Sequence, residues 1–573
     1  MTFYTRVILL TIFLLQFFRA NAQESNTYII GYVKDEVTKE GVEGALVYEK
    51  SLQKGVETDE NGFFQLSVNP GVSLVVIIRR VGYDLASVQL DPVKDGEVKK
   101  LDISLNLKDA GKGVTIYAES IGDKNMVRAN VQEFKLLPSV SGNLESLLPS
   151  IALGTTSGSG GELTSQYNVR GGNYDENLVY VNDFEIFRPQ LIRAGQQEGL
   201  SFPNIDLIRD LAFSSGGFEA KYGDKLSSVL DIKYKRPEET RGSFMASMLG
   251  ASAHLEGSFK PIKKQGGKVR YLLGARYKTT RYILGSLDTK GEYLPNFIDL
   301  QAYVTYDFKP NWQLALIGNI NQAKYNFTPT ESEVVTGGFF FPNKFSADFE
   351  GKEDDKFKNN MGGLALNFVP AKKQNPSFVK FLTSVYNADE VEAFDILSYF
   401  QVTKLELDLE GGKPKEIGVL GNGVQHSFAR NRLQNIILNG ELKAGIEIPR
   451  FNDDKGYETS HFLYGGIKVQ QEHFKDRLNE WARTDSAGYS LPNAEEEYQL
   501  ASVIKSVNDV SSTRFTAFGQ ETFTYKKLSK YEIQTTIGAR VGYWSFNDEF
   551  IVSPRAQFLV RPLGRENPIT YKV

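Results

Sequence analysis

The chain of 573 residues contains no cysteine, which excludes disulfides, thiolate metal sites, cysteine nucleophiles and an acylated N-terminal cysteine together. Only four histidines occur, and none of them stands in a metal-ligand spacing such as H-E-x-x-H. There is also no Gly-rich phosphate loop and no G-x-S-x-G nucleophile elbow. These absences argue against an enzyme, and we expect no metal site and no cofactor.

An excess of charge of one sign is absent as well. The 66 Lys and Arg residues nearly balance the 70 Asp and Glu residues, which leaves a net charge of -4 and a pI near 5.9. A nucleic-acid partner requires a concentrated basic face, so we expect none. At this length the chain is too long for one ordinary domain, and we expect several.

Long apolar runs are missing except at the N-terminus. Arg6 precedes a nearly unbroken apolar stretch, residues 7–18, and Ala20-Asn21-Ala22 provides small residues on both sides of a cleavage position. The alternative is a transmembrane anchor, but spanning a bilayer takes about 20 apolar residues. Residues 1–22 are therefore predicted to be a signal peptide, and the mature chain is expected to be exported.

The chain is rich in glycine and aromatic residues, and many of its segments alternate apolar and polar residues. It contains 52 glycines, and 12% of its residues are aromatic. Segments 270–278 and 531–543 alternate apolar and polar residues, with similar runs at 297–309, 312–327, 357–369, 378–392, 432–447, 460–474 and 513–526. A soluble sandwich would also alternate. Run length and aromatic residues at the run ends favour an antiparallel transmembrane β-barrel over residues 238–573.

The connections between these runs alternate in length. Those near 309–311, 370–376 and 526–530 are short, whereas 282–296, 328–356 and 475–511 are long and polar. Short turns on one side and long loops on the other are typical of the periplasmic and extracellular faces of a barrel.

Residues 27–107 contain short β-type runs separated by turn residues, which indicates a small β-sandwich. Its pattern, GYVKDEVTKEGVEGALVYEK followed by TDENGFF and RRVGYD, resembles the carboxypeptidase-regulatory-like domain. That resemblance implies no peptidase activity. An inert spacer and a docking role both stay open.

Residues 121–237 indicate a mixed α/β domain. The segments SQYNVRGGNYDENLVYVND and GGFEAKYGDKLSSVLDI closely resemble the two long motifs of the plug domain of TonB-dependent receptors. The motif residues of interest are Arg170, Gly171, Gly172, Asp183, Gly216, Gly217, Tyr222 and Gly223.

The residue types of these motifs suit a compact domain inside a barrel. Glycine pairs allow backbone angles closed to other residues and close backbone approach. The resemblance places Arg170 as a permanent cation facing carboxylates of the barrel wall. Asp183 and Asp231 are expected to be turn or strand-end residues rather than ligands, and Tyr222 to be packed rather than ligand-binding.

Residues 108–120 form a Gly-containing linker that ends in a lone β-prone segment: Val114, Thr115, Ile116, Tyr117 and Ala118. A strand without a partner is unstable by itself, but it can pair with the sheet edge of another protein. The segment resembles the TonB box, which the coupling protein TonB binds. The alternative is that it is the first strand of the next domain.

Phe339, Phe340 and Phe341 lie within one of the long polar connections. Exposed aromatic residues often mark a binding site, so this run is a candidate ligand loop. Packing against neighbouring loops explains it equally well.

The resemblance implies a mainly β receptor of the outer membrane that imports a nutrient: a glycan, a peptide, an iron chelate or cobalamin. Implied partners are TonB, outer-membrane lipid, the nutrient and, as a further candidate, a surface lipoprotein. A structural, secretion or signalling barrel is the alternative. The chain has fewer barrel runs than the family's barrel requires and ends at 566–573 inside a strand-like segment, so we expect an incomplete barrel.

Overall fold

The structure is a computed structural model. It describes residues 27–35, 41–49, 55–59, 61–80, 83, 86–105, 126–130, 143–150, 152, 154–157, 166–189, 200–261, 267–279, 291–293, 296–309, 311–336, 342–370, 375, 377–406, 414–452, 457–485, 499–527, 531–562 and 571–572. The expected signal peptide lies outside these residues. Contacts divide the chain into two compact units, residues 1–112 and 113–573. Within the described part of the chain, no helix has the length and apolar character needed to cross a membrane.

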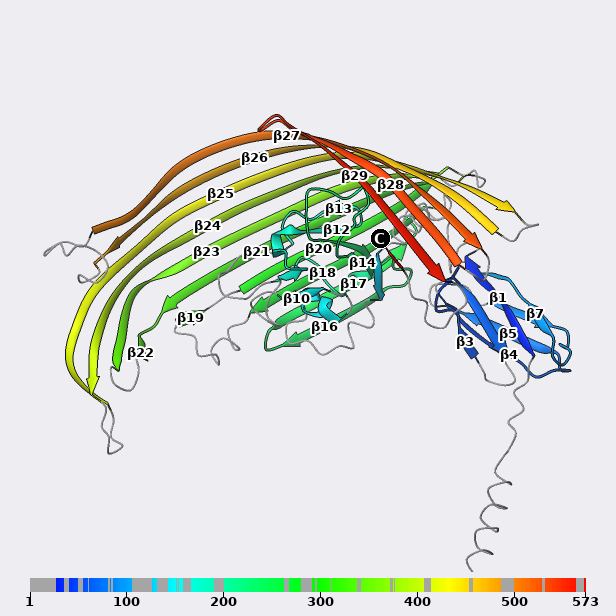
Figure 1. Ribbon diagram of the computed structural model, residues 1–573, viewed down its shortest axis with the longest axis horizontal. Coiled ribbons are helices and arrows are strands. Elements are labelled where there is room, and N and C mark those ends of the chain that lie inside the picture. Colours follow the sequence, from blue (N-terminus) through cyan, green and yellow to red (C-terminus); the bar gives the residue numbers. More distant parts are fainter. Residues whose placement is uncertain are drawn as a thin grey trace, which may run out of the picture. The chain divides into compact units, whose positions relative to one another are not determined.

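The first unit consists of two small sheets (Figure 1). Strands β4, β1 and β7 form one sheet, in which β8 also pairs with β1, and β3-β2-β5-β6 form the other. The strands are β1 Tyr28–Asp35, β2 Leu46–Glu49, β3 Gly55–Glu57, β4 Phe63–Ser67, β5 Leu74–Arg79, β6 Ala86–Leu90, β7 Val98–Lys100 and β8 Ile103–Leu105. Alternate residues, such as Ile29 and Val33 or Val76 and Ile78, are buried in one shared core. The expected N-terminal β-sandwich is confirmed.

A tight turn before β4 explains the TDENGFF segment. The carboxylate of Asp59 accepts hydrogen bonds from the amides of Asn61 (2.9 Å) and Phe63 (2.8 Å). Gly62 follows with φ +74°, and a Cβ there would lie 2.2 Å from the carbonyl oxygen of Val33. Glycine is therefore required at this position by both its backbone angle and the close approach of β1.

The second unit begins with a mixed sheet in the order β13-β12-β15-β14-β9, beside the pair β10-β11. These strands are β9 Val127–Asn130, β10 Thr155–Ser157, β11 Tyr167–Val169, β12 Asn177–Val181, β13 Phe184–Glu185, β14 Ile208–Ser214 and β15 Ser228–Tyr234. A short helix, α4 (Leu144–Leu147), and the 3-10 turns η1 (Leu148–Ser150) and η3 (Tyr174–Glu176) accompany them. We call this part of the chain the plug region.

The rest of the second unit is one antiparallel sheet of fifteen described strands. Its path is β16-β17-β18-β20-β21-β23-β24-β25-β26-β27-β28-β29-β30, with β19 pairing β21 and β22 pairing β23. The strands are β16 Arg241–Ser247, β17 Gly250–Phe259, β18 Lys268–Thr279, β19 Gly291–Tyr293, β20 Asn296–Lys309, β21 Trp312–Pro329, β22 Ser332–Thr336, β23 Asn343–Phe368, β24 Ser377–Glu406, β25 Lys415–Asn452, β26 Tyr457–Thr484, β27 Gln499–Lys527, β28 Tyr531–Trp544, β29 Glu549–Pro562 and β30 Tyr571–Lys572. The expected mainly β fold with a large antiparallel sheet is confirmed.

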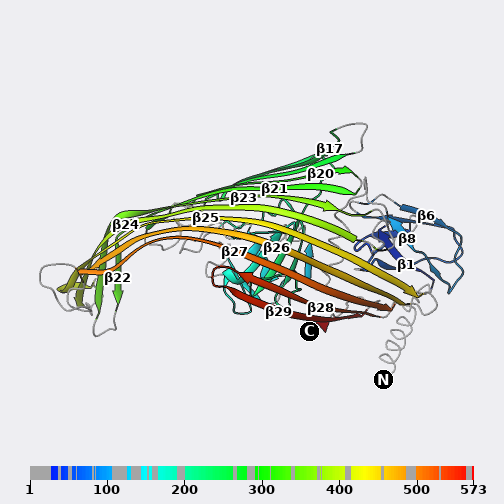
Figure 2. The same cartoon turned by 90° about the horizontal axis from the view of Figure 1, so that it is seen from above.

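The plug region packs against one face of this sheet (Figures 1 and 2). Leu207 and Phe213 of the plug region share one buried cluster with Leu272, Phe297 and Phe357 of the sheet. We call this the inner face. The contact shows which side is covered in the strands that it reaches.

The two faces of the sheet have opposite chemistry. On β21, the inner-facing side chains of Gln313, Asn319 and Asn321 are buried, whereas Leu316 and Ile320 on the other face are 44% and 51% exposed. An apolar exposed face and a polar covered face reverse the order found in a soluble protein, and they match a barrel that stands in lipid.

Five consecutive strands are longer than the sequence indicates. β23 to β27 contain 26, 30, 38, 28 and 29 residues, and they run through much of 328–356 and 475–511. The expectation of long loops there is wrong. Polar residues on both faces hide the alternation, but main-chain pairing with the neighbouring strands continues through these segments. With 38 residues at roughly 3.3 Å each, β25 is about 125 Å long. Roughly ten strand residues are enough to cross a bilayer, so β25 extends far beyond such a span.

The turn at Gly62 gives a first prediction. Gly62→Ala should destabilise the sandwich by roughly 3 kcal/mol or more, because left-handed strain adds to a clash with the backbone. Gly71→Ala is the matched control: φ there is +79°, but nothing lies within 4 Å of the new Cβ, so the loss should be roughly 1–2 kcal/mol. Urea unfolding of residues 27–112 by circular dichroism measures both. Equal losses would contradict the steric argument.

Candidate functional site

Three polar clusters join the plug region to the inner face of the large sheet, and the first is built on a hairpin tip. Strands β12 and β13 are joined by Asn182 and Asp183, whose φ values are +49° and +71°. Two left-handed residues in a two-residue loop make the turn that suits the twist of a hairpin, and Asn and Asp tolerate it best. The turn directs the Asp183 carboxylate toward the sheet wall.

Lysines surround that carboxylate. The ammonium group of Lys380 on β24 lies 2.6 Å from one Asp183 oxygen, and that of Lys233 on β15 lies 3.1 Å from the other. Lys443 stands directly opposite Lys380 on the next strand. Burial alone would raise the pKa of Asp183, but the charges of Lys233, Lys380 and Lys443 outweigh it and hold the pKa well below its usual range. Asp183 is therefore a turn residue and an ion-pair partner at once.

A second carboxylate of the same hairpin reaches the next strand. Glu185 lies 2.6 Å from the ammonium group of Lys468 on β26, and Glu441 lies 3.0 Å from Lys443. Asp183, Glu185 and the wall lysines Lys380, Lys443 and Lys468 together form what we call the hairpin clasp. Three adjacent strands of the sheet thus hold one plug hairpin by charge.

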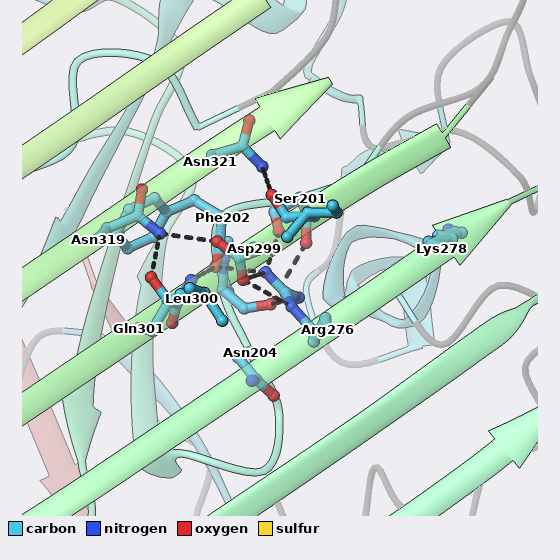
Figure 3. Close-up of polar contacts among 12 residues, drawn as sticks. Ser201, Phe202, Asn204, Arg276, Lys278, Asp299, Leu300, Gln301, Asn319 and Asn321 are labelled. Carbon is cyan, nitrogen blue, oxygen red and sulfur yellow. Dashed lines mark hydrogen bonds and ion pairs between the residues drawn. The ribbon is translucent and has the colours of Figure 1, made fainter. Parts of the chain in front are cut away.

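The second cluster is built around Arg276 on β18 (Figure 3). Its guanidinium donates to the Asp299 carboxylate at 2.6 and 2.8 Å, and to the backbone carbonyls of Ser201 (2.9 Å) and Pro203 (3.1 Å) of the plug region. Asn319 donates to the other Asp299 oxygen at 2.7 Å. A buried carboxylate thereby orients an arginine that binds plug backbone rather than a plug side chain.

Two further contacts extend this cluster. The side-chain amide of Gln301 donates to the Phe202 carbonyl at 2.6 Å and accepts from the Tyr234 hydroxyl at 2.8 Å. Lys278 donates to the Asn143 side chain at 3.2 Å, at the start of helix α4. Segment 200–204 is therefore held at three backbone carbonyls, those of Ser201, Phe202 and Pro203.

A buried acid lies beside this cluster. Glu145 of helix α4 is 2% exposed, and its Oε2 atom has no hydrogen-bond partner among the described residues. Burial raises the pKa of Glu145 to about 7, although Ser201, Arg276 and Lys278 act in the opposite direction. Near neutral pH this carboxyl group is thus divided between its acid and its ionised form.

The third cluster gathers the second plug motif against β27, β28 and β29. Arg555 donates to the carbonyls of Glu219 (2.7 Å) and Tyr222 (2.5 Å), and Gln557 donates to the Gly217 carbonyl. Gly223 is packed against Arg540, where a Cβ would lie 2.1 Å from Nε.

Side chains of the same motif are also engaged. The Tyr222 hydroxyl is buried and donates to Asp231 at 3.0 Å, and the Glu219 carboxylate accepts from Gln520 at 3.0 Å. Gly216 has φ +135°, a backbone angle that L side chains rarely adopt. The structure therefore brings Gly216, Gly217, Tyr222 and Gly223 together at one wall.

The first motif behaves differently. Arg170 has φ +51° and is exposed, and among the described residues its guanidinium contacts no carboxylate of the sheet, so the expected position against the wall is not observed. Its side chain lies near Gly154 and Gly216 instead. Gly171 has φ +81°, and a Cβ at Gly172 would lie 1.9 Å from the Ser227 hydroxyl. Both glycines serve the local turn.

Two predicted sites lie outside the described residues: the proposed TonB box, Val114 to Ala118, and the candidate ligand loop, Phe339 to Phe341. The sequence analysis missed the wall cations, which are Arg276, Lys278, Lys380, Lys443, Lys468, Arg540 and Arg555. Their only signal is a basic residue at an inner-facing position of an alternating strand, which cannot be recognised until the inner face is known. No cluster of three or more metal-ligating residues occurs within the described ranges.

Comparison with known proteins bears first on the N-terminal unit. Residues 29–114 match the family described as CarboxypepD_reg-like domain. This stretch is a CarboxypepD_reg-like domain. The resemblance found in its sequence is thus confirmed, although the match covers only this part of the chain. No curated protein matches the chain.

Solved structures resemble the chain loosely. A mutant of the ferric enterobactin receptor PfeA from Pseudomonas aeruginosa, in complex with enterobactin, aligns with 78% of this chain and 93% of its own at 9% identity and a TM-score of 0.28. The siderophore receptor PirA from Acinetobacter baumannii aligns with 78% of this chain and 92% of its own, at 9% identity and a TM-score of 0.28. The copper transporter OprC aligns with 77% of this chain and 84% of its own, at 8% identity and a TM-score of 0.26. TM-scores this low do not establish what this chain binds.

The hairpin clasp predicts that Asp183→Asn loosens the plug hairpin. Removing this charge leaves Lys380 without its ion-pair partner and Lys233 with only Asp231, at a cost of roughly 2 kcal/mol for a partly exposed site. Hydrogen exchange of residues 177–185 should then be about 30-fold faster. Because the pKa of Asp183 is lowered in the folded chain, the stability that its ion pairs contribute is complete at neutral pH and is lost only below pH 4. Asp175→Asn, an exposed aspartate of the same region, should change nothing; an equal effect there would refute the clasp.

The buried Glu145 predicts that the stability of the plug region falls as pH rises, which is opposite to the effect of Asp183. Its pKa is raised from 4.5 to about 7 in the folded chain, so the fold loses stability as pH rises through this window. Glu145→Gln should remove that slope and stabilise the plug region by roughly 2–3 kcal/mol at pH 8. Thermal unfolding at pH 5 and pH 8 measures the difference. An unchanged slope, as expected for Asp175→Asn, would show that another group titrates.

Proposed function

We propose that this chain is a TonB-dependent transport receptor of the outer membrane that imports a nutrient. The observation that carries the proposal is the hairpin clasp: a region with both plug motifs is held by charge against the polar inner face of a large antiparallel sheet. Such a region blocks the interior of a barrel while it is in place. Removing it opens a path.

The outer face of the sheet supports a membrane location. Leu273, Leu300, Val379, Leu442 and Ile467 are all 40% exposed or more and lie on five different strands. An exposed apolar face of this width is unfavourable in water and favourable in lipid. The predicted signal peptide provides the route of export.

The mechanism follows from how the plug is held. Its contacts with the wall include many ion pairs and hydrogen bonds, which water can replace when the plug moves. TonB pairs with the main chain of Val114 to Ala118 and pulls, using the proton-motive force of the inner membrane, after a ligand has bound on the extracellular side. Arg276 and Arg555 hold plug carbonyls, so these bonds break without leaving a plug charge behind.

The ligand is a glycan, a peptide, an iron chelate or cobalamin. The CarboxypepD_reg-like domain favours a glycan or another polymer fragment, because the resemblance noted in its sequence is to an extension common in receptors of that kind. A surface lipoprotein is a further proposed partner.

Growth of mutant strains tests the proposal. A deletion strain is compared with Ile116→Pro and Ile116→Val strains under limitation for iron, cobalamin, glycans or peptides in turn. Proline removes a main-chain donor from the coupling strand, whereas valine keeps it. We expect the deletion and the Pro strain to share a growth defect on one nutrient, with the Val strain normal. A defect in the deletion but not in the Pro strain would exclude TonB coupling through this segment. No defect on any nutrient would favour the structural, secretion or signalling alternative.

A further inference from the structure

Strand β27 has an uncovered edge over half of its length. It pairs with β26 from Gln499 to Lys527, but with β28 only from Arg514 onward. The last main-chain contact on that side joins Thr513 and Ser545, where the chain turns from β28 towards β29, and beyond it only the Trp544 indole reaches the Ser512 hydroxyl. Figure 1 shows β27 continuing well beyond that turn. Residues 499–512 therefore form a sheet edge among the described residues.

The direction of the free main-chain groups follows from that last contact. The carbonyl of Thr513 accepts from the amide of Ser545 at 3.0 Å, so Thr513 faces outward from β26. In an antiparallel sheet every second residue shares this direction. Residues Val503, Lys505, Val507, Asp509 and Ser511 consequently direct their amides and carbonyls toward the open side.

This edge lacks the usual protection. Val507 is 78% exposed, and Leu500 and Ile504 are 58% and 49% exposed. The segment contains no proline, and its register with β26 is regular from Ser502 onward. Natural proteins blunt such edges with short strands, prolines, bulges or several charges, because a long regular apolar edge pairs with another strand. Here the only charges are Lys505 and Asp509.

We propose that a second copy of this chain pairs with this edge, β27 against β27, around a two-fold axis at Val507. The pairing is antiparallel, and Val507 lies opposite Val507 of the second copy. Each Lys505 then faces Asp509 of the second copy on the same side of the joined sheet, so two ion pairs form. The axis falls on an outward-facing residue, so each of the five outward-facing residues exchanges hydrogen bonds with its counterpart.

Charge selects this register from its neighbours. A two-fold axis at Lys505 or at Asp509 would bring two like charges together, which is unfavourable directly across a sheet. With the axis at Val507, Ile504 meets Val510 of the second copy and Ser506 meets Asn508 of the second copy. Apolar residues thus oppose apolar ones, and polar residues oppose polar ones.

Both charges have capacity for the new contacts. Among the described residues Lys505 forms no ion pair, and Asp509 has only two contacts of 3.6 Å, to Lys475 and to His473. Exposed pairs at such distances are weak. A closer partner on a second copy would therefore be the strongest interaction available to either side chain.

The absence of cysteine makes the test direct. In Val507→Cys the two new thiols lie on the two-fold axis, at a Cα separation of about 5.5 Å that suits a disulfide. Val503→Cys is the matched control: Val503 lies on the same side of the same strand and is 47% exposed, but it faces Ser511 of the second copy. Cells carrying either variant are oxidised with copper phenanthroline, and the products are separated without reductant.

We expect a covalent dimer of twice the monomer mass for Val507→Cys, with at least about tenfold more product than for Val503→Cys. In the Val507→Cys background, Lys505→Glu should lower the yield about three- to tenfold, because two attractive contacts become repulsive. Adding Asp509→Lys should restore it by exchanging the charges. Equal cross-linking of the two cysteine variants, no product from either, no effect of Lys505→Glu, or cross-linking of Val507→Cys to a different protein would each overturn the proposal.

Discussion

The inner face of the large sheet is polar, and this constraint governs the rest of the second unit. Gln313, Asn319, Lys380 and Lys443 are buried on that face, and buried polar groups require partners. The sheet supplies some of these partners, such as Asp299 for Asn319, and the plug region supplies others, such as Asp183 for Lys380 and the backbone carbonyls that Arg276 and Arg555 bind. The location of the plug region therefore depends on charge and hydrogen bonding together with the apolar cluster that it shares with the sheet.

The two ways of supplying partners have different consequences. The hairpin clasp depends on the side chains of Asp183 and Glu185, so its strength depends on their ionisation. The contacts of Arg276 and Arg555 depend on carbonyl groups, which every residue has. One set of contacts is specific in sequence and the other only in backbone path. A plug held in both ways is positioned by polar contacts in addition to the apolar cluster that it shares with the wall.

Local patterns predicted the strands but not the contacts between distant ones. Alternation placed the segments 297–309 and 531–543 close to β20 and β28, because each strand is buried on one face only. The extensions of β23 and β27 were missed because both of their faces are polar or exposed, which removes the alternation. Lys380 lies 197 residues from Asp183, and no spacing in the sequence relates them. Arg170 was expected at the wall by analogy, whereas Gly172 and Ser227 fix a turn that leaves it exposed.

The hairpin clasp also has a kinetic consequence. Mobile ions screen buried charges poorly and exposed charges well, and the screening length is about 8 Å at physiological salt. While the clasp is closed, dissolved salt has little access to Asp183 and its lysines. Once it is open, the same charges attract one another through an electrolyte. Rising ionic strength should therefore slow the return of the hairpin more than it speeds its departure, so that the time the hairpin spends away from the sheet depends on the ions in the surrounding solution.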